Sequence, residues 1–333
     1  MSSTYTEADE LGDILRGSLW DYDIERVKNL LSKLTDYQIY ELLSTEIGTL
    51  HPVADRGISF IDEVAYFGHT GLLVTLLSSL PSAERLKLIE GGIDTALHTA
   101  AYQGHTETVS AVLKFLTGDQ QIQLLFTQTG WGDTALHIAA GNGHTHTVKF
   151  MLENLIPEQK LQLLFTQNGK GHTALHEAAD YGHTGTVETL LDNLTPEQQL
   201  ELLFVQDRFG HSALHLAAYS VDGFTETVRS LLSNLTPDQQ LKVLITQDSD
   251  GDTALHDAAW RGHTEKVKTL LDNLTPEQQL KLLSLYNKKG NTASQRAAGT
   301  YGTSETITAL GQYQIEADYR VNYRKFAGLI SNS

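Results

Sequence analysis

The sequence predicts an all-α solenoid of about eight helical repeats, on the strength of three observations. The segment Thr-Ala-Leu-His begins at residues 95, 134, 173 and 253, and Ser-Ala-Leu-His begins at residue 212, so successive starts lie 39, 39, 39 and 41 residues apart. A glycine turn and a leucine-rich segment follow each motif, and prolines recur in phase at residues 157, 196, 237 and 276. A length of 333 residues suggests two average domains, but this period favours one solenoid.

The first helix of a repeat is predicted from the last Thr-Ala-Leu-His motif. The Thr253 hydroxyl can cap the helix start. Leu255, Ala258 and Ala259 form an apolar stripe at helical spacing, and the two alanines leave room for a neighbouring helix. Gly262 can adopt the left-handed conformation that ends a helix. We therefore expect a short helix between Thr253 and Gly262.

Two further helices are predicted in the same repeat. Thr264 restarts the chain, and an apolar face follows at Val267, Leu270, Leu271 and Leu274. Thr275 and Pro276 then begin a third helix, with Gln278 three residues after the threonine cap. Five of the six prolines, Pro81, Pro157, Pro196, Pro237 and Pro276, hold this helix-start position. Each repeat therefore carries an extra short helix.

The repeats weaken toward both ends of the chain. Two residues are inserted near Val221–Gly223, and degenerate repeats lie near Ser59–Asp62 and Thr292–Gln295. We expect a degenerate N-terminal capping repeat at 1–56, full repeats at 57–290, and a degenerate repeat with a capping helix at 291–333. The tail is expected to form an amphipathic helix that covers the last repeat, with a targeting or secretion signal as the alternative. Its apolar residues are Ile315, Tyr319, Tyr323, Phe326, Leu329 and Ile330.

The composition narrows the classes of function. There are 41 acidic and 24 basic residues, and a net charge of −17 disfavours nucleic acids and anionic membranes as partners. The absence of cysteine excludes thiol nucleophiles, disulfides and thiolate metal sites. The apolar runs are too short to span a bilayer, and the acidic N-terminus does not have the pattern of a Sec-type signal peptide. We therefore expect a soluble, cytoplasmic protein.

The run Gly-Asp-Thr-Ala-Leu-His-x-Ala-Ala-x-x-Gly-His-Thr-x-x-Val-x-x-Leu-Leu resembles the ankyrin repeat over residues 57–310, and more weakly over 11–50. The resemblance implies an elongated right-handed solenoid whose first helices line a concave binding face. Two features depart from the family: alanine stands where proline is common, and the repeat has about 39 residues instead of about 33. The third helix accounts for the excess and implies an altered hairpin. Long-period repeats of this kind are similar to ankyrin proteins of intracellular bacteria that are delivered into host cells.

The fourteen histidines raise the question of metal or catalytic chemistry. Ten hold fixed repeat positions, five at the end of the (Ser/Thr)-Ala-Leu-His motif and five after a turn glycine, which favours structural roles. His144 with His146, or His172 with His176, has the local spacing of metal ligands, but no His-Glu-x-x-His motif is present. The nucleophile-elbow, phosphate-loop and dinucleotide fingerprints are also absent. We expect no metal, no cofactor and no catalysis.

Positions that vary among repeats are free of packing demands, so they are candidates for recognition. One variable set ends the first helix or follows the motif histidine, and the other forms the loop tip between repeats. The family resemblance places the first set on the concave face, where large aromatics are typical interface anchors. The alternative is that these aromatics pack against the next loop or third helix. The predicted partner-binding residues are Tyr66, Tyr102, Trp131, Glu177, Asp180, Tyr181, Phe209, Tyr219, Asp257, Trp260 and Arg261.

The distribution of charge completes the functional hypothesis. Residues 51–285 carry 28 acids and 14 bases, and acids on the presumed concave helices favour a partner protein with a basic or mixed surface. We expect a monomeric, non-catalytic scaffold that binds this partner through its concave face and loop tips. The alternatives are an effector delivered into the host cytosol to bind or mimic a host regulator, an enzyme with a dispersed site, and an assembly of chains stacked end to end.

Overall fold

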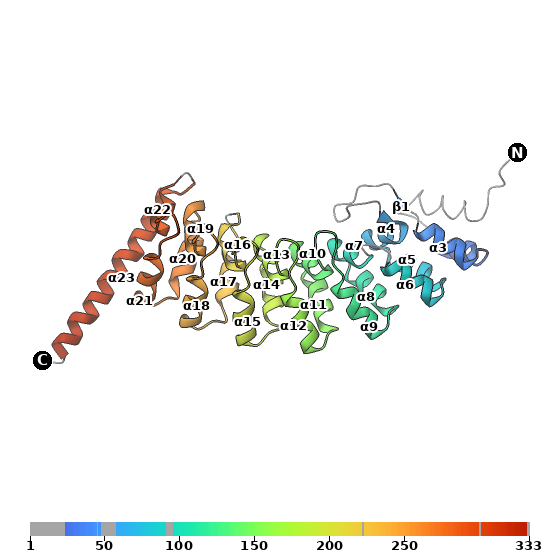
Figure 1. Ribbon diagram of the computed structural model, residues 1–333, viewed down its shortest axis with the longest axis horizontal. Coiled ribbons are helices and arrows are strands. Elements are labelled where there is room, and N and C mark those ends of the chain that lie inside the picture. The colour runs from blue at the N-terminus through green and yellow to red at the C-terminus, as the bar shows by residue number, and fades with distance from the viewer. Residues whose placement is uncertain are drawn as a thin grey trace. The chain divides into compact units, whose positions relative to one another are not determined.

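A computed structural model describes residues 24–44, 46–47, 58–90, 96–221, 223–299 and 301–331. The chain divides into two compact units, Met1–Leu163 (unit 1) and Leu164–Ser333 (unit 2). Short helices make up most of the described part of each unit (Figure 1). Much of the expected N-terminal capping segment, residues 1–23 and 48–56, lies outside the described residues.

Unit 1 repeats an order of first, second and third helices. The first helices α4 (Phe60–Tyr66), α7 (Ala96–Gln103) and α10 (Ala135–Gly141) pack side by side, as do the second helices α5 (Thr70–Ser78), α8 (Thr106–Lys114) and α11 (Thr145–Glu153). The third helices are α6 (Ser82–Glu90), α9 (Gly118–Phe126) and α12 (Pro157–Phe165), the last of which crosses into unit 2. Helices α2 (Ile24–Leu31) and α3 (Asp36–Ser44) precede them.

One short strand pair in unit 1 accompanies the otherwise all-α array. Strands β1 (Glu46–Ile47) and β2 (Ile58–Ser59) run antiparallel, with Glu46 opposite Ser59 and Ile47 opposite Ile58. The pair leads directly into α4, which begins at Phe60. It forms the only sheet among the described residues, and their architecture is otherwise an all-helical repeat array.

Unit 2 contains the same three kinds of helix, which Figure 1 shows as three rows. The first helices are α13 (Ala174–Asp180), α16 (Ala213–Tyr219), α19 (Ala254–Arg261) and α22 (Ala293–Ala297). The second helices are α14 (Thr184–Leu191), α17 (Thr225–Leu232) and α20 (Thr264–Asp272). The third helices are α15 (Pro196–Leu203), α18 (Pro237–Leu244) and α21 (Pro276–Leu283). Neighbours within each row are in contact, so the core is continuous along the unit.

The predicted boundary signals of the first helix are confirmed at α19. The Thr253 side chain and the His256 ring form a reciprocal capping box at its start. Gly262 ends it in the left-handed conformation, with φ at 72°. Ala258 and Ala259 are fully buried, and their small side chains allow α19 to pack directly on α16 and α22. Local chemistry therefore sets the bounds of this helix.

The third helix both begins as predicted and completes the second helix. Thr275 and Gln278 form a capping box, and Pro276 is the first residue of α21. The Gln279 side chain then donates to the carbonyl of Leu271 at 3.0 Å, near the end of α20, where helical carbonyls have no intrahelical partner. Pro81 is a small exception to the proline prediction, because α6 begins one residue after it. The third helix is thus an integral part of each repeat.

The predicted tail residues Ile315, Tyr319 and Tyr323 lie on the C-terminal helix α23 (Ser304–Ser331), which packs against α20, α21 and α22. However, the residues buried on it are Thr306, Ala309, Leu310 and Ala317, whereas Ile315, Tyr319 and Tyr323 are exposed. The side chains of Phe326, Leu329 and Ile330 lie outside the described residues. The residues that pack against α20–α22 are mostly small, which allows close helix approach, and Ile315, Tyr319 and Tyr323 face outward.

Candidate functional site

The predicted aromatic residues at the first-helix ends of unit 2 form a row. Tyr219 at the end of α16 stacks on Trp260 of α19, with ring centroids 5.7 Å apart. Trp260 also meets the ring of Tyr301 edge-on at 5.0 Å. Tyr181 holds the same repeat position after α13 and is exposed, as are Tyr219 and Tyr301. Trp260 is half-buried by its neighbours, so the packing alternative applies to it but not to the three tyrosines.

Two arginines are held against this aromatic row. The guanidinium carbon of Arg261 lies 4.1 Å from the centroid of the Tyr219 ring, and Arg261 Nε donates to the Tyr219 carbonyl at 3.2 Å. Arg296 lies 5.3 Å from the Trp260 ring, and its Nη2 atom contacts Asp252 Oδ2 at 2.7 Å. Such cation–π contacts favour a fixed orientation of the guanidinium groups. The arginines are therefore ordered before any partner binds.

Three predicted residues lie in unit 1. Tyr66 and Tyr102 stack with centroids 6.3 Å apart, and both are half-buried. Their carbonyls accept hydrogen bonds from the turn histidines of the next repeats, His105 Nε2 at 3.0 Å and His144 Nε2 at 2.8 Å. Trp131 stands at a loop tip and is exposed. Unit 1 thus repeats the aromatic stack on a smaller scale.

The loop tips of unit 2 are joined by a ladder of backbone hydrogen bonds. The Arg208 amide donates to the Lys170 carbonyl at 3.2 Å, and the Ser249 amide donates to the Phe209 carbonyl at 2.9 Å. The Lys288 amide continues the ladder to the Asp250 carbonyl at 3.0 Å. Successive tips therefore lie side by side. Their exposed side chains include Lys170, Arg208, Phe209, Lys288 and Lys289.

A side chain inside each loop holds the tip in shape. Asp207 Oδ1 accepts hydrogen bonds from the amides of Phe209 and His211, both at 2.8 Å. The equivalent residues Asn168, Asp248 and Asn287 accept two amides in the same way. These are Asx turns, in which a short polar side chain replaces backbone partners. The tips are thus ordered by their own sequences and by their neighbours.

Beneath the tips, acids and histidines alternate in a buried network. His172 Nδ1 lies 3.0 Å from Glu177 Oε1, and His172 Nε2 lies 3.4 Å from Asp207 Oδ2. His211 then joins Asp207 Oδ2 at 3.3 Å to Asp248 Oδ2 at 3.4 Å. The network connects three successive loops within unit 2. It couples the loops through charges that are largely withdrawn from solvent, although the His211 side chain is 32% exposed.

The network reassigns two predicted partner-binding residues. Glu177 and Asp257 are only 8% and 7% exposed, so neither offers much surface to a partner. Glu177 already accepts from Asn168 Nδ2 at 2.9 Å and contacts His172. Asp180 is half-buried at the end of α13. The residue type at these positions was compatible with recognition, but Glu177 is held by the loop that precedes its own helix, and Asp257 is buried.

The pKa values in the network follow from burial and from the nearest charges. The hydrogen bond from His211 to Asp248 and the charge of Asp207 raise the pKa of His211 to about 9, although burial opposes this. Burial also opposes ionisation of Asp248, but hydrogen bonds from His211 and loop amides hold its pKa below the usual range. The pKa of Asp257 is well above the usual range because the residue is buried near Asp248 and Asp252. Asp257 is therefore the acid most inclined to stay neutral.

The motif histidines have the structural role that the repeat predicts. The Thr173 amide donates to His176 Nδ1 at 3.2 Å, so this nitrogen carries no proton, and Nε2 donates to the His211 carbonyl at 3.3 Å. His215 repeats the arrangement from Ser212 to the Asp252 carbonyl. Burial lowers the pKa of His176 and His215 to about 4, so both are neutral at pH 7. His176, His215 and His256 each link their own helix start to the following loop.

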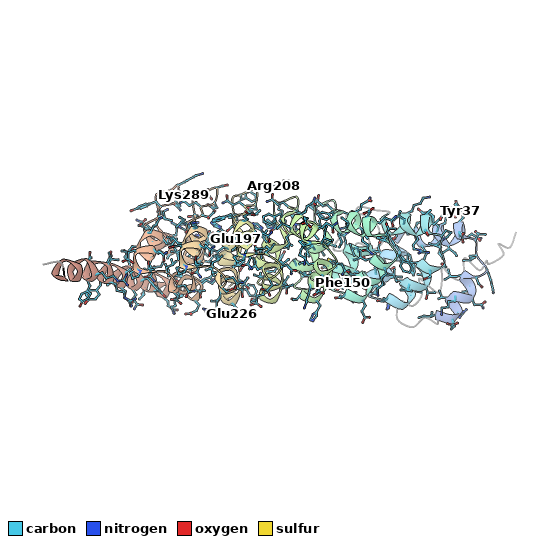
Figure 2. All side chains as sticks on the ribbon, turned by 90° about the horizontal axis from the view of Figure 1, so that it is seen from below. Tyr37, Phe150, Glu197, Arg208, Glu226 and Lys289 are labelled. Atoms are coloured by element: carbon cyan, nitrogen blue, oxygen red, sulfur yellow. The ribbon has the colours of Figure 1, made fainter. Side chains whose placement is uncertain are left out.

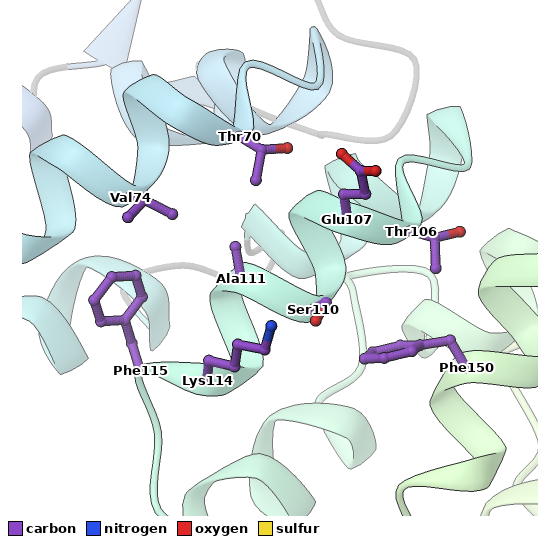
Figure 3. Close-up of a pocket in the computed structure, with 9 residues that line it drawn as sticks. All are labelled: Thr70, Val74, Thr106, Glu107, Ser110, Ala111, Lys114, Phe115 and Phe150. Carbon is purple, nitrogen blue, oxygen red and sulfur yellow. The ribbon is translucent and has the colours of Figure 1, made fainter. Parts of the chain in front are cut away.

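A separate open groove of about 520 Å³ lies between the second helices α5, α8 and α11 of unit 1 (Figure 3). Its lining is largely apolar and includes Val74, Ala111, Phe115 and Phe150. Glu107 and Lys114 are the charged groups among its lining residues. The groove holds no cluster of groups suited to acid–base or nucleophilic chemistry, so it is a weaker candidate than the unit 2 surface.

Two kinds of functional feature are absent from the described residues. Among them, no three or more histidines, aspartates and glutamates are placed so as to hold a metal ion, and the suggested His172–His176 pair is a ring stack with centroids 5.6 Å apart. Across the same part of the chain, no helix combines the length and apolar character needed to cross a membrane.

Comparison among repeats alone could have found several residues that sequence reasoning missed. His172 and His211 share one repeat position, four residues before the motif histidine. Arg296 falls at the position of Asp257 once the degenerate repeat at Thr292 is aligned. Tyr301 had no such signal, because the turn after α22 departs from the repeat spacing. Periodicity therefore reveals network members only where the period is kept.

Comparisons with known proteins agree with this architecture. A family model described as ankyrin repeats (three copies) matches residues 62–154, 118–201 and 198–281. The chain is similar in structure to the ankyrin repeat domain of Bcl-3, a member of the IkappaB family, with a TM-score of 0.56, 21% identity, and 75% of this chain and 96% of that chain covered. It is also similar to EF0377, an ankyrin repeat protein, with a TM-score of 0.50, 23% identity, and 63% and 95% covered. No curated protein sequence matches the chain significantly.

Proposed function

Because this chain belongs to the ankyrin repeat family, whose members generally bind proteins and are typically non-catalytic, we propose that it is an interaction scaffold with its principal site on unit 2. The site, called here the recognition surface, comprises the first-helix ends and loop tips of that unit. Its residues are Tyr181, Tyr219, Trp260, Arg261, Tyr301, Lys170, Arg208, Phe209, Lys288 and Lys289. Tyr66, Tyr102 and Trp131 supply a second contact area on unit 1.

The observation that carries the proposal is the exposed aromatic row backed by ordered arginines. Tyrosine, tryptophan and arginine are the side chains that most often dominate binding energy at protein interfaces. Here Arg261 is already stacked on Tyr219, so little side-chain entropy is lost when a partner binds. The row also lies at a position where the repeats differ, so the repeat pattern itself does not require these residue types.

Site-specific photo-crosslinking tests the proposal. A photoreactive phenylalanine analogue is placed at Tyr181 or Tyr301 on the recognition surface, and at Tyr319 on α23 as an exposed control. The adducts formed in cell extract are identified by mass spectrometry, and each partner is then purified and titrated calorimetrically against the full chain. We expect the same protein at both recognition positions and not at Tyr319.

A double variant then measures the contribution of the row. Replacing Tyr219 and Trp260 with alanine removes two anchors, each worth about 2 kcal/mol when central, so affinity for the purified partner should fall by at least about 100-fold. The matched control replaces Tyr319 and Tyr323, an exposed pair whose rings stack 6.1 Å apart on α23. If the Tyr219 and Trp260 variant folds normally and keeps its affinity, the proposed site is wrong.

A further inference from the structure

The exposed charges of unit 2 are separated between two groups of elements. On the loop tips and first-helix ends, outside the buried network and Arg296, the charged residues are Lys170, Arg208, Arg261, Lys288 and Lys289, against Asp180 and Asp250. On or next to the second and third helices, they are Glu188, Asp192, Glu197, Glu201, Glu226, Asp238, Glu265, Asp272 and Glu277, against Arg229, Lys242, Lys268 and Lys281. Figure 2 shows Arg208 and Lys289 along one edge and Glu226 along the opposite edge. The recognition surface is therefore basic within an acidic chain.

This separation changes the expected chemistry of the partner. The expectation of a basic or mixed partner depended on the acids of the first helices, chiefly Glu177, Asp180 and Asp257. Glu177 and Asp257 are buried, and the Glu177 carboxylate already contacts Asn168 and His172. A partner's lysine or arginine cannot replace those contacts without leaving buried groups unpaired. The side chains that remain available on this surface are mainly basic and aromatic, with Asp180 and Asp250 as the acidic exceptions.

We propose that the recognition surface binds an acidic segment of the partner protein, an inference that rests on the proposed function. Arg261 is positioned for such a segment, because its Nε is held by the Tyr219 carbonyl while the guanidinium presents two further nitrogens in a fork that matches a carboxylate. Lys288 and Lys289 supply point charges on the same ladder of tips. Apolar groups of the segment pack on the aromatic row.

The chemistry favours an acidic peptide over a nucleic acid. Charges are screened beyond about 8 Å at physiological salt, so a short segment with a few carboxylates responds mainly to the local basic residues. A phosphate polymer would extend past unit 2's basic tips toward the acidic second and third helices. The exposed tyrosines also suit the mixed apolar and acidic side chains of a peptide.

Three labelled peptides provide the binding test. They share one 12-residue pattern of leucine and phenylalanine and differ only in carrying glutamate, glutamine or lysine at the remaining positions. Fluorescence anisotropy is measured with the full chain at 50 and 300 mM NaCl. The glutamate peptide should bind at least about 10-fold more tightly than the glutamine peptide, and added salt should reduce this difference. Tighter binding of the lysine peptide would overturn the inference.

Charge-reversal variants locate the effect. Lys288→Glu with Lys289→Glu alters two exposed loop-tip residues, and Lys242→Glu with Lys281→Glu makes the same charge change on the third helices. The first pair should weaken glutamate-peptide binding at least about 10-fold and the second less than about 2-fold, with unchanged circular dichroism. Arg208→Glu provides an independent reversal on the same ladder should the lysine variant fold poorly.

The remaining outcomes separate this inference from the proposed function. Equal losses in the two lysine pairs would mean that binding follows net charge alone, and the inference fails. It also fails if single-stranded DNA of equal charge binds more tightly than the glutamate peptide and is weakened by the same variants. If crosslinking identifies a partner at Tyr181 and Tyr301 whose contacting segment is basic, the scaffold function stands and only the acidic-segment inference falls.

Discussion

Replacing Lys266 with threonine should destabilise unit 2 by about 3–5 kcal/mol, because this buried lysine caps a helix that lacks the usual glycine turn. Lys266 lies in α20 and is fully buried. Its Nζ atom donates to the carbonyls of Ala217 and Ser220, both at 2.8 Å, to the Ser220 hydroxyl at 3.2 Å and to the Val221 carbonyl at 3.1 Å. These acceptors lie at the end of α16, where the two-residue insertion interrupts the repeat.

A comparison with the other repeats gives the magnitude. The equivalent of Ala217 in α13 is Ala178, whose carbonyl accepts the His183 amide at 2.9 Å because Gly182 turns the chain. The insertion removes that turn, and Lys266 supplies the missing donor. When threonine replaces Lys266, at least two buried carbonyls lose their hydrogen-bond donor, and each loss lowers the free energy of unfolding by about 1–3 kcal/mol. The missing lysine side chain also leaves a cavity. One new hydroxyl pair offsets about 1 kcal/mol.

That hydroxyl pair makes a compensating variant possible. In most of the other repeats this position is threonine, as where Thr184 and Thr227 hydroxyls lie 2.8 Å apart between α14 and α17. Deleting residues 221 and 222 restores the standard turn length, so the deletion combined with Lys266→Thr should recover most of the lost stability. The deletion alone should destabilise unit 2. The restored turn would use the carbonyls that now accept from Lys266, so the buried ammonium group would lose its partners.

Urea unfolding and hydrogen exchange measure the stability of four proteins: the wild type, Lys266→Thr, the deletion of residues 221 and 222, and the two changes combined. Exchange at the end of α16 gives a local readout, which suits a repeat array whose units open separately. Lys268→Thr, next to the site but paired with Glu265 at the surface, is the control and should change little. A cost below about 1 kcal/mol for Lys266→Thr, or additive effects of substitution and deletion, would refute the capping argument.

Three further predictions follow from burial and backbone geometry. His176 and His215 have a folded pKa of about 4 against about 6.5 unfolded, so the unfolded chain binds more protons between these pH values. Each histidine should therefore lower the free energy of unfolding by about 2 kcal/mol when the pH falls from 8 to 5. Unchanged urea midpoints of unit 2 would contradict this. His211 has a raised folded pKa of about 9, so its contribution is complete below pH 6.5 and is lost as pH rises through 9, and His211→Gln should remove that alkaline loss in the same titration. Gly182→Ala should destabilise by about 2 kcal/mol in thermal unfolding, because φ is +72° and the added methyl would lie 2.1 Å from a phenylalanine ring atom, whereas Gly311→Ala in the open interior of α23 should be neutral or stabilising.

The sequence determined the kinds of helix and their order. Threonine caps, glycine turns and prolines act on residues a few positions away, so Thr253, Gly262 and Pro276 mark helix bounds that α19 and α21 confirm. The repeat period also identified the variable positions on which the functional prediction rests, because Tyr219 and Trp260 hold the same variable position in adjacent repeats. Partner contact by these residues remains a prediction.

Only the tertiary structure decided which of these side chains face solvent. Glu177 and Tyr181 are four residues apart on one helix, yet the carboxylate is buried against the adjoining loop and the ring is exposed. Lys266 reaches acceptors 45 to 49 residues earlier in the chain. Local capping depends on neighbours in sequence, whereas burial and long-range pairing depend on contacts that are made only in the folded array. The repeat period therefore predicted where the variable residues fall, and contacts between repeats determined which of them are exposed.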